Sequence, residues 1–198
     1  MAANNPTFFS KLVLLDPVLF APIMLTFLRL VKALGFKSPN PLVRKALRRQ
    51  TRWPTRADAK RELDGAGVFK GWDESALDAY VNFALRQADD GVSLKCSPQR
   101  EAEVFASYPY PLWSELMKIQ QSMTILYGED TAPFMKRAIK VLASKKAVAK
   151  KTASKNTPLK ETSCQVKVMA GGHCFMQEYP EAAAKAVLQS ISPSFFSR

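Results

Sequence analysis

One pattern recurs in the second half of the chain and limits the folds that the chain can adopt: a short apolar run, then a loop, then a helix that begins at proline. The run Met123–Tyr127 leads through a loop to a helix from Pro133, and the run Gln165–Met169 leads through a second loop to a helix from Pro180. Strands that alternate with helices at this spacing favour a parallel sheet with helical crossovers. We therefore expect an α/β fold.

The apolar N-terminal stretch predicts one more strand, at Leu12–Leu15, and a helix that begins at Pro22 and ends at Gly35. A membrane-spanning helix needs about 20 uninterrupted apolar residues, whereas the charged residues Asp16 and Arg29 bound the longest run here. A signal peptide would show a basic start and a small-residue cleavage site, and neither is evident. We therefore expect a cytoplasmic protein and interpret the stretch as part of a folded core.

The segment from residue 23 to residue 113 carries helix signals, and we expect it to form an all-helical unit. Thr55 followed by Asp58 has the form of a capping box. Asp73 can cap a helix whose apolar residues recur at helical spacing along one face. The residues Asp89–Gly91 predict a turn between two such helices.

The three predicted strands end in loops that carry side chains suited to acid–base chemistry. Asp16 follows the first strand, Glu129 and Asp130 follow the second, and His173 follows the third. Because the carboxyl ends of parallel strands meet at one edge of a sheet, we expect these side chains to gather there. A carboxylate that orients a general-base histidine activates a nucleophile in this way. His173 is the only histidine of the chain, so we predict that it is the base.

Three segments resemble the C-terminal part of an α/β-hydrolase of the AB hydrolase-1 type. The segment KLVLLDPVLFAP resembles the family's sixth strand, SMTILYGED its seventh strand with the acid loop, and VKVMAGGHCFMQEYPEAAAKAV its eighth strand, histidine loop and last helix. The resemblance implies a partial α/β-hydrolase fold of about three parallel strands with flanking helices. Residues 1–22 and 114–198 would form its core, and residues 23–113 an inserted helical cap or lid.

The resemblance also implies a hydrolase that acts on an ester-like or other small apolar substrate. In the family, a serine on a G-x-S-x-G turn attacks the carbonyl and the histidine accepts its proton. The chain contains no G-x-S-x-G, so we expect the nucleophile and the first five strands to lie upstream of Met1, and this chain alone to be inactive. Two alternatives stay open: a non-catalytic, hydrolase-like or basic binding protein, and epoxide hydrolase or dehalogenase chemistry.

The acid of the catalytic set has more than one candidate. Relatives often carry it three residues after the glycine of the seventh-strand loop, but that position is Thr131 here. Asp130, one residue earlier, is therefore the first candidate, and Glu129 is also open. Asp16 is the second candidate, because some relatives orient the histidine from the end of the sixth strand.

The basic residues, which give the chain a net charge of +12, are concentrated in two stretches. Arg29–Arg61 contains 11 of the 29 lysines and arginines, and Lys136–Lys160 contains nine. We interpret residues 144–163 as a basic, disordered insertion. It predicts at most weak contact with an anionic membrane surface. Because the tract holds no aromatic residue for base stacking, we expect no specific nucleic-acid binding.

The remaining expectations concern metals, cofactors and self-association. Cys96, Cys164 and Cys174 are scattered, with one histidine beside them, so we predict no zinc site and no cofactor. The strand Leu12–Leu15 would lack its neighbour and expose an apolar edge. Unpaired edges promote association, so we expect self-association.

Overall fold

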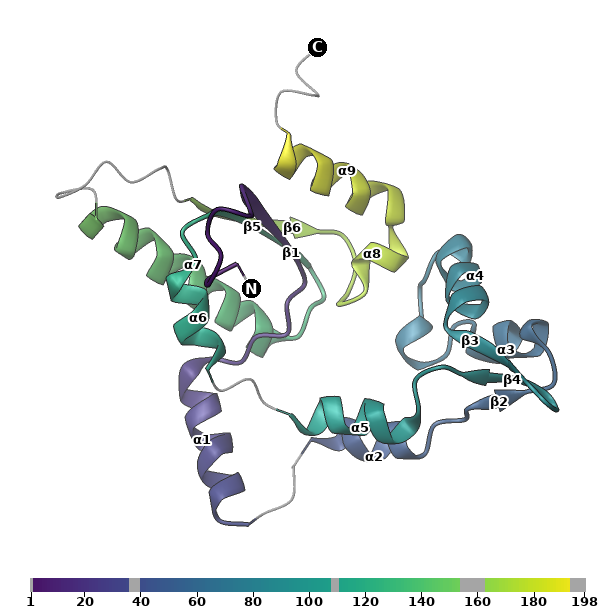
Figure 1. The fold of residues 1–198 in the computed structure, drawn as a ribbon. Helices are drawn as coiled ribbons and strands as arrows, with labels where there is room; N and C mark the ends of the chain where they lie inside the picture. Colours follow the sequence, from purple (N-terminus) through teal and green to yellow (C-terminus); the bar gives the residue numbers. More distant parts are fainter. Residues whose placement is uncertain (1, 36–39, 108–110, 154–162, 193–198) are drawn as a thin grey trace. The chain divides into compact units, whose positions relative to one another are not determined.

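The computed structural model describes residues 2–35, 40–107, 111–153 and 163–192. The chain divides into two compact units (Figure 1). Unit 1 comprises Met1–Leu25 and Tyr110–Arg198, and unit 2 comprises Thr26–Pro109. Helix α1 (Pro22–Ala33) crosses from the first unit into the second.

Unit 1 is built on a parallel sheet of three strands in the order β1-β5-β6. The strands are β1 (Lys11–Leu15), β5 (Ser122–Gly128) and β6 (Cys164–Met169). Their register places Leu14 opposite Ile125 and Ile125 opposite Val166. The helices of the unit are α6 (Leu112–Lys118), α7 (Pro133–Ala153), α8 (Phe175–Glu178) and α9 (Pro180–Ile191). This parallel sheet with flanking helices is the α/β architecture that the strand–loop–helix pattern predicts.

The central strand β5 is an almost continuous apolar run because helices cover both of its faces. On one face, side chains of β5 and α7 pack together: Met123, Ile125, Tyr127, Ala138, Ile139 and Leu142. On the other face, Leu126 packs against Phe175, Ala183 and Ala186 from α8 and α9. The outer strands β1 and β6 are the sheet's edges in the described part of the chain. Self-association through the edge of β1 stays a prediction.

Helix α7 corrects the expectation of a disordered insertion at residues 144–163. The helix continues to Ala153, since lysine and alanine, which fill this stretch, both favour helix. The ammonium group of Lys146 turns inward and donates to two backbone carbonyl oxygens. One is that of Met117 in α6, at 3.3 Å, and the other is that of Ile119, just after α6, at 2.6 Å. Burial of this group lowers its pKa. The rest of the predicted insertion, residues 154–162, lies outside the described residues.

Unit 2 contains a small antiparallel sheet, so the expectation of an all-helical unit was wrong. Strands β2 (Arg52–Trp53), β4 (Gly91–Leu94) and β3 (Leu85–Ala88) pair in that order. Ala88 pairs with Gly91, so the predicted turn is the two-residue loop of a β-hairpin. Strands of two to four residues are too short to show the alternation that signals a half-buried strand.

The helices of unit 2 begin where the sequence places their caps. They are α2 (Pro41–Leu47), α3 (Arg56–Leu63), a short 3₁₀ turn (Gly67–Phe69), α4 (Glu74–Phe83) and α5 (Pro98–Ala106). The hydroxyl of Thr55 accepts the Asp58 N–H at 3.1 Å, and the Asp73 carboxylate accepts the Ser75 N–H at 2.9 Å. Both predicted caps are therefore confirmed.

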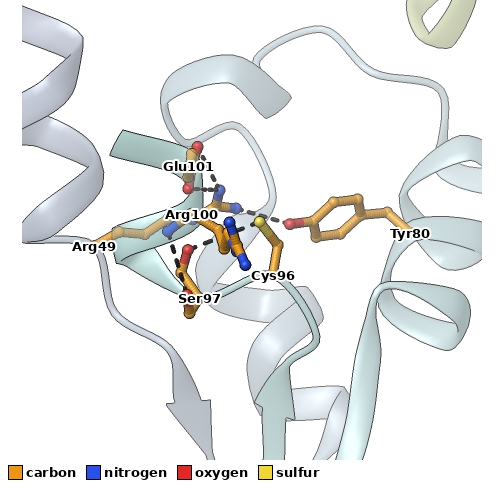
Figure 2. A network of polar contacts seen from close by, with 6 residues as sticks. All are labelled: Arg49, Tyr80, Cys96, Ser97, Arg100 and Glu101. Atoms are coloured by element: carbon orange, nitrogen blue, oxygen red, sulfur yellow. Dashed lines mark hydrogen bonds and ion pairs between the residues drawn. The ribbon is translucent and has the colours of Figure 1, made fainter. Parts of the chain in front are cut away.

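A partly buried polar network centred on Arg49 joins two helices of unit 2, α4 and α5, to the segment that follows α2 (Figure 2). Its guanidinium donates to both carboxylate oxygens of Glu101, at 3.2 and 3.1 Å, and to the hydroxyl of Tyr80 at 2.8 Å. Arg49 also lies over the Phe69 ring, 5.7 Å from its centroid. Burial raises the pKa of the Tyr80 hydroxyl. Arg49 thus has a structural partner for each end of its guanidinium.

Replacement of Arg49 by alanine is expected to lower the free energy of unfolding of unit 2 by about 1–3 kcal/mol, because Glu101 and Tyr80 both lose a charge-assisted partner away from bulk water. Urea denaturation followed by tryptophan fluorescence measures the change. Arg100→Ala is the matched control, because its ion pair with Glu103 is exposed (79% and 66% for the two side chains) and such pairs contribute about 0–1 kcal/mol. Equal effects of the two substitutions would contradict the structural role of Arg49.

Candidate active site

Asp16 lies directly after β1 in a backbone conformation that few residues other than glycine adopt. Its φ angle is 35°, and its N–H donates to the carbonyl oxygen of Leu126 on β5 at 2.7 Å. Aspartate tolerates this region better than most side chains, and such backbone conformations cluster at functional sites. The side chain is fully buried, so its carboxylate depends on protein groups for hydrogen bonds.

His173 follows the glycine pair that ends the β6 loop, and its ring meets the Asp16 carboxylate. The Nδ1 atom of His173 lies 3.0 Å from Oδ2 of Asp16. Half of the His173 side chain is exposed to solvent, whereas none of the Asp16 side chain is. A buried carboxylate at this distance favours the tautomer with a proton on Nδ1, which leaves Nε2 as a proton acceptor.

The carboxylate changes the proton affinity of the imidazole. The hydrogen bond from His173 to Asp16 raises the pKa of His173, and this effect exceeds the opposing effect of partial burial. A raised pKa means that the protonated ring is stabilised in the folded protein. The arrangement therefore suits a base that must hold a proton during a reaction step.

The raised pKa of His173 predicts a pH-dependent contribution to stability. The contribution is fully present below the unfolded-state pKa, about 6.5 for histidine, and is lost as pH rises through the higher folded-state pKa. The difference in free energy of unfolding between the wild type and His173→Gln should thus be larger at about pH 5.5 than at about pH 8.5. Urea denaturation at the two pH values measures it. If the difference in free energy of unfolding instead grows with pH, the pKa of His173 is lowered in the folded protein, which would contradict the prediction.

Thr131 provides a second hydrogen bond to the same carboxylate oxygen. Its hydroxyl donates to Oδ2 of Asp16 at 2.5 Å, and the residue is almost wholly buried. The N–H of Thr131 donates to the carbonyl oxygen of Gly128 at 3.0 Å, which closes the turn after β5. The sequence singled out this position only as the one where relatives carry their acid. The hydrogen bond from Thr131 to Asp16 could not be predicted from the sequence, because the two residues lie 115 positions apart.

Thr131→Val should lower the free energy of unfolding by about 1–3 kcal/mol, because the isosteric side chain leaves a buried carboxylate with one donor fewer. The other oxygen of that carboxylate, Oδ1, is buried and has no hydrogen-bond partner among the residues that the structure describes, so it offers no compensation. Chemical denaturation measures the loss, and Thr131→Ser, which keeps the hydroxyl, should recover most of it. A Thr131→Val protein as stable as the wild type would exclude this role.

The structure brings Asp16, rather than the first candidate Asp130, to His173. The side chains of Asp130 and Glu129 are exposed, and their N–H groups donate to the carbonyl oxygens of Gly171 (3.0 Å) and Met169 (2.8 Å). The tight turn from Gly128 directs the Thr131 hydroxyl to Asp16 and places the Asp130 backbone against the histidine loop. The described residues thus place Asp16, and not Asp130 or Glu129, within hydrogen-bond distance of His173, and which carboxylate serves as the acid stays a prediction.

Two further features of the structure concern residue clusters that could bind a metal ion and helices that could span a membrane. Across residues 2–35, 40–107, 111–153 and 163–192, no three or more histidine, cysteine or acidic side chains gather in a way that could hold a metal ion. Among the helices of the same residues, none combines the length and the apolar character needed to cross a bilayer.

Comparison with solved structures identifies the fold. The chain is similar to E-2-(acetamidomethylene)succinate hydrolase (TM-score 0.62, 15% identity, 96% of this chain and 60% of that chain). It is also similar to a peroxisomal alpha-beta-hydrolase from Saccharomyces cerevisiae (TM-score 0.70, 11% identity, 100% and 51%). A third similar structure is an esterase from M. tuberculosis (TM-score 0.58, 16% identity, 96% and 57%).

These similarities extend over nearly all of this chain but over only part of each hydrolase. The chain spans 51–60% of the length of these three structures. No protein-family model and no curated protein sequence matches the chain. At identities of 11–16% the structural likeness establishes the fold. The chain therefore has a partial α/β-hydrolase fold.

Proposed function

We propose that this chain carries the acid–base part of a hydrolase active site, with His173 as the general base and Asp16 as the residue that orients it. The hydrogen bond between His173 Nδ1 and Asp16 Oδ2, at 3.0 Å, is the observation that carries the proposal. The burial of the carboxylate and the raised pKa of the imidazole support it.

In the proposed reaction, Asp16 stays ionised and accepts the Nδ1–H of His173. The Nε2 atom accepts the proton of a serine hydroxyl as that oxygen attacks an ester-like carbonyl, and it later returns the proton to the leaving group. Thr131 holds the carboxylate in place through its hydroxyl. The chain contains no G-x-S-x-G, so in this proposal the serine would be supplied by another polypeptide segment.

The proposed substrate is a small molecule with an ester-like bond and an apolar part. The named structures with this fold include an esterase and a hydrolase, which supports hydrolytic chemistry at a carbonyl. Unit 2 takes the role of the cap in this proposal, since a segment of this size follows β1 where the resemblance places the insertion. Weak contact of the basic residues with an anionic membrane surface stays part of the proposal.

Fluorophosphonate labelling tests the proposal, because the reagent modifies only serines activated by a base. The 198-residue chain should remain unlabelled, and a longer polypeptide that adds a serine elbow should be labelled in a manner that depends on His173. His173→Gln should slow that labelling by orders of magnitude, with Lys185→Gln on α9 as the control. Labelling that is indifferent to His173 would refute the proposed base, and turnover of an epoxide but not an ester would favour the alternative chemistry.

A further inference from the structure

The loop that carries His173 is held from its C-terminal side by a carboxylate. The N–H of Gly172 donates to Oε2 of Glu178, the last residue of α8, at 2.9 Å. A Cβ built on Gly172 would lie 3.2 Å from Oε1 of Glu178, and one built on Gly171 would overlap Oε2. Gly171 also has a φ angle of +95°, which L side chains rarely adopt. The two glycines thus allow the carboxylate to lie directly against the loop backbone.

The other contacts of the loop act on different atoms. The Asp130 N–H binds the carbonyl oxygen of Gly171 at 3.0 Å, and the Phe175 N–H binds that of Gly172 at 3.1 Å. Phe175, two residues after His173, is completely buried and anchors the far end of the loop. These bonds restrain the two carbonyl groups. The Gly172 N–H, one residue before His173, is restrained by the Glu178 side chain.

We infer that Glu178 is a positioning residue that fixes the Gly171–Gly172 backbone, so that the His173 ring reaches Asp16. The inference rests on the proposed function, since it concerns the same histidine. Without an acceptor at Glu178, the Gly172 N–H must turn toward solvent to regain a hydrogen bond. That rotation moves the adjoining residue His173 and lengthens its contact with Asp16.

The pKa of His173, followed by NMR titration of its ring protons in the 198-residue chain, reports whether the ring stays against Asp16. Glu178→Ala should shift this pKa downward, in the direction of Asp16→Asn. Glu178→Gln should leave it near the wild-type value, because the amide oxygen can still accept from Gly172. Glu181→Ala is the control for loss of a nearby negative charge, since Glu181 is an exposed residue in the first turn of α9.

Equal downward shifts in Glu178→Ala, Glu178→Gln and Glu181→Ala would show a charge effect and overturn the positioning role, as would an unchanged pKa in Glu178→Ala. A wild-type pKa that Asp16→Asn does not lower would instead refute the proposed function. Hydrogen exchange of the Gly172 amide in the wild type gives a test that needs no variant to fold. Slow exchange supports the bond to Glu178, and exchange as fast as in an open loop overturns it.

Discussion

Asp16→Asn is expected to abolish the upward shift in the pKa of His173 and, in a serine-bearing form of the polypeptide, to lower kcat for ester hydrolysis by about 10⁴-fold. Asparagine has the shape of aspartate but no charge, so it does not stabilise the imidazolium. Its amide can donate to Nδ1, which favours the tautomer with the proton on Nε2, and that tautomer cannot accept the serine proton. Steady-state kinetics with an activated ester measures the loss.

The matched control for this substitution is Asp130→Asn, in the neighbouring loop. The Asp130 side chain is exposed, whereas that of Asp16 is fully buried against His173. We expect Asp130→Asn to change kcat by less than about twofold, since only its N–H holds the histidine loop and the substitution keeps the N–H. A large loss of kcat in Asp130→Asn together with a small one in Asp16→Asn would instead indicate that the acid is Asp130, in the loop after β5.

Gly128→Ala is expected to lower the free energy of unfolding of unit 1 by about 3 kcal/mol. A Cβ on Gly128 would overlap the carbonyl oxygen of Gly172 and lie 2.5 Å from that of Gly171. Both obstacles are backbone atoms, so relief requires the end of β5 and the histidine loop to separate. The pKa of His173 should therefore fall in the same variant. Denaturation and NMR titration measure the two effects.

Gly172→Ala provides the comparison within the same loop. Its Cβ would meet only the end of the flexible Glu178 side chain, 3.2 Å away. A few tenths of an ångström of side-chain movement relieves this contact, so we expect a cost below about 1 kcal/mol. Comparable losses in free energy of unfolding for Gly128→Ala and Gly172→Ala would contradict this explanation. They would mean that the close contact between the end of β5 and the histidine loop does not position His173.

The sequence was sufficient to predict the parallel sheet of unit 1, because each strand there is an apolar run with a distinct stop. Leu12–Leu15 ends at Asp16, and Met123–Tyr127 ends at Gly128. The small sheet of unit 2 was not predicted, because its strands have only two to four residues. Such short strands are stabilised by pairing with each other and carry little signal of their own. Helix α7 continued beyond its expected end because Lys146 turns inward to bind backbone carbonyls of α6 and the segment that follows.

The sequence predicted that Asp16 and His173 gather at the strand ends, where the structure brings them together, but it could not show which carboxylate meets the histidine. The choice between Asp16 and Asp130 depends on which way the turn from Gly128 to Thr131 directs each side chain. That direction is set by hydrogen bonds between residues 115 positions apart, as between Thr131 and Asp16. The contact between Glu178 and the Gly172 N–H is local, six positions apart, but it was not predicted because it depends on how the histidine loop folds back over α8.

NMR titration of the histidine ring in the 198-residue chain shows whether Asp16 holds His173, because the chain contains a single histidine and its signal needs no assignment by mutation. We predict that the pKa of His173 lies above the ordinary value, about 6.5, drops to or below that value in Asp16→Asn, and stays raised in Asp130→Asn. A pKa that is ordinary in the wild type, or that falls only in Asp130→Asn, would contradict the pairing of His173 with Asp16.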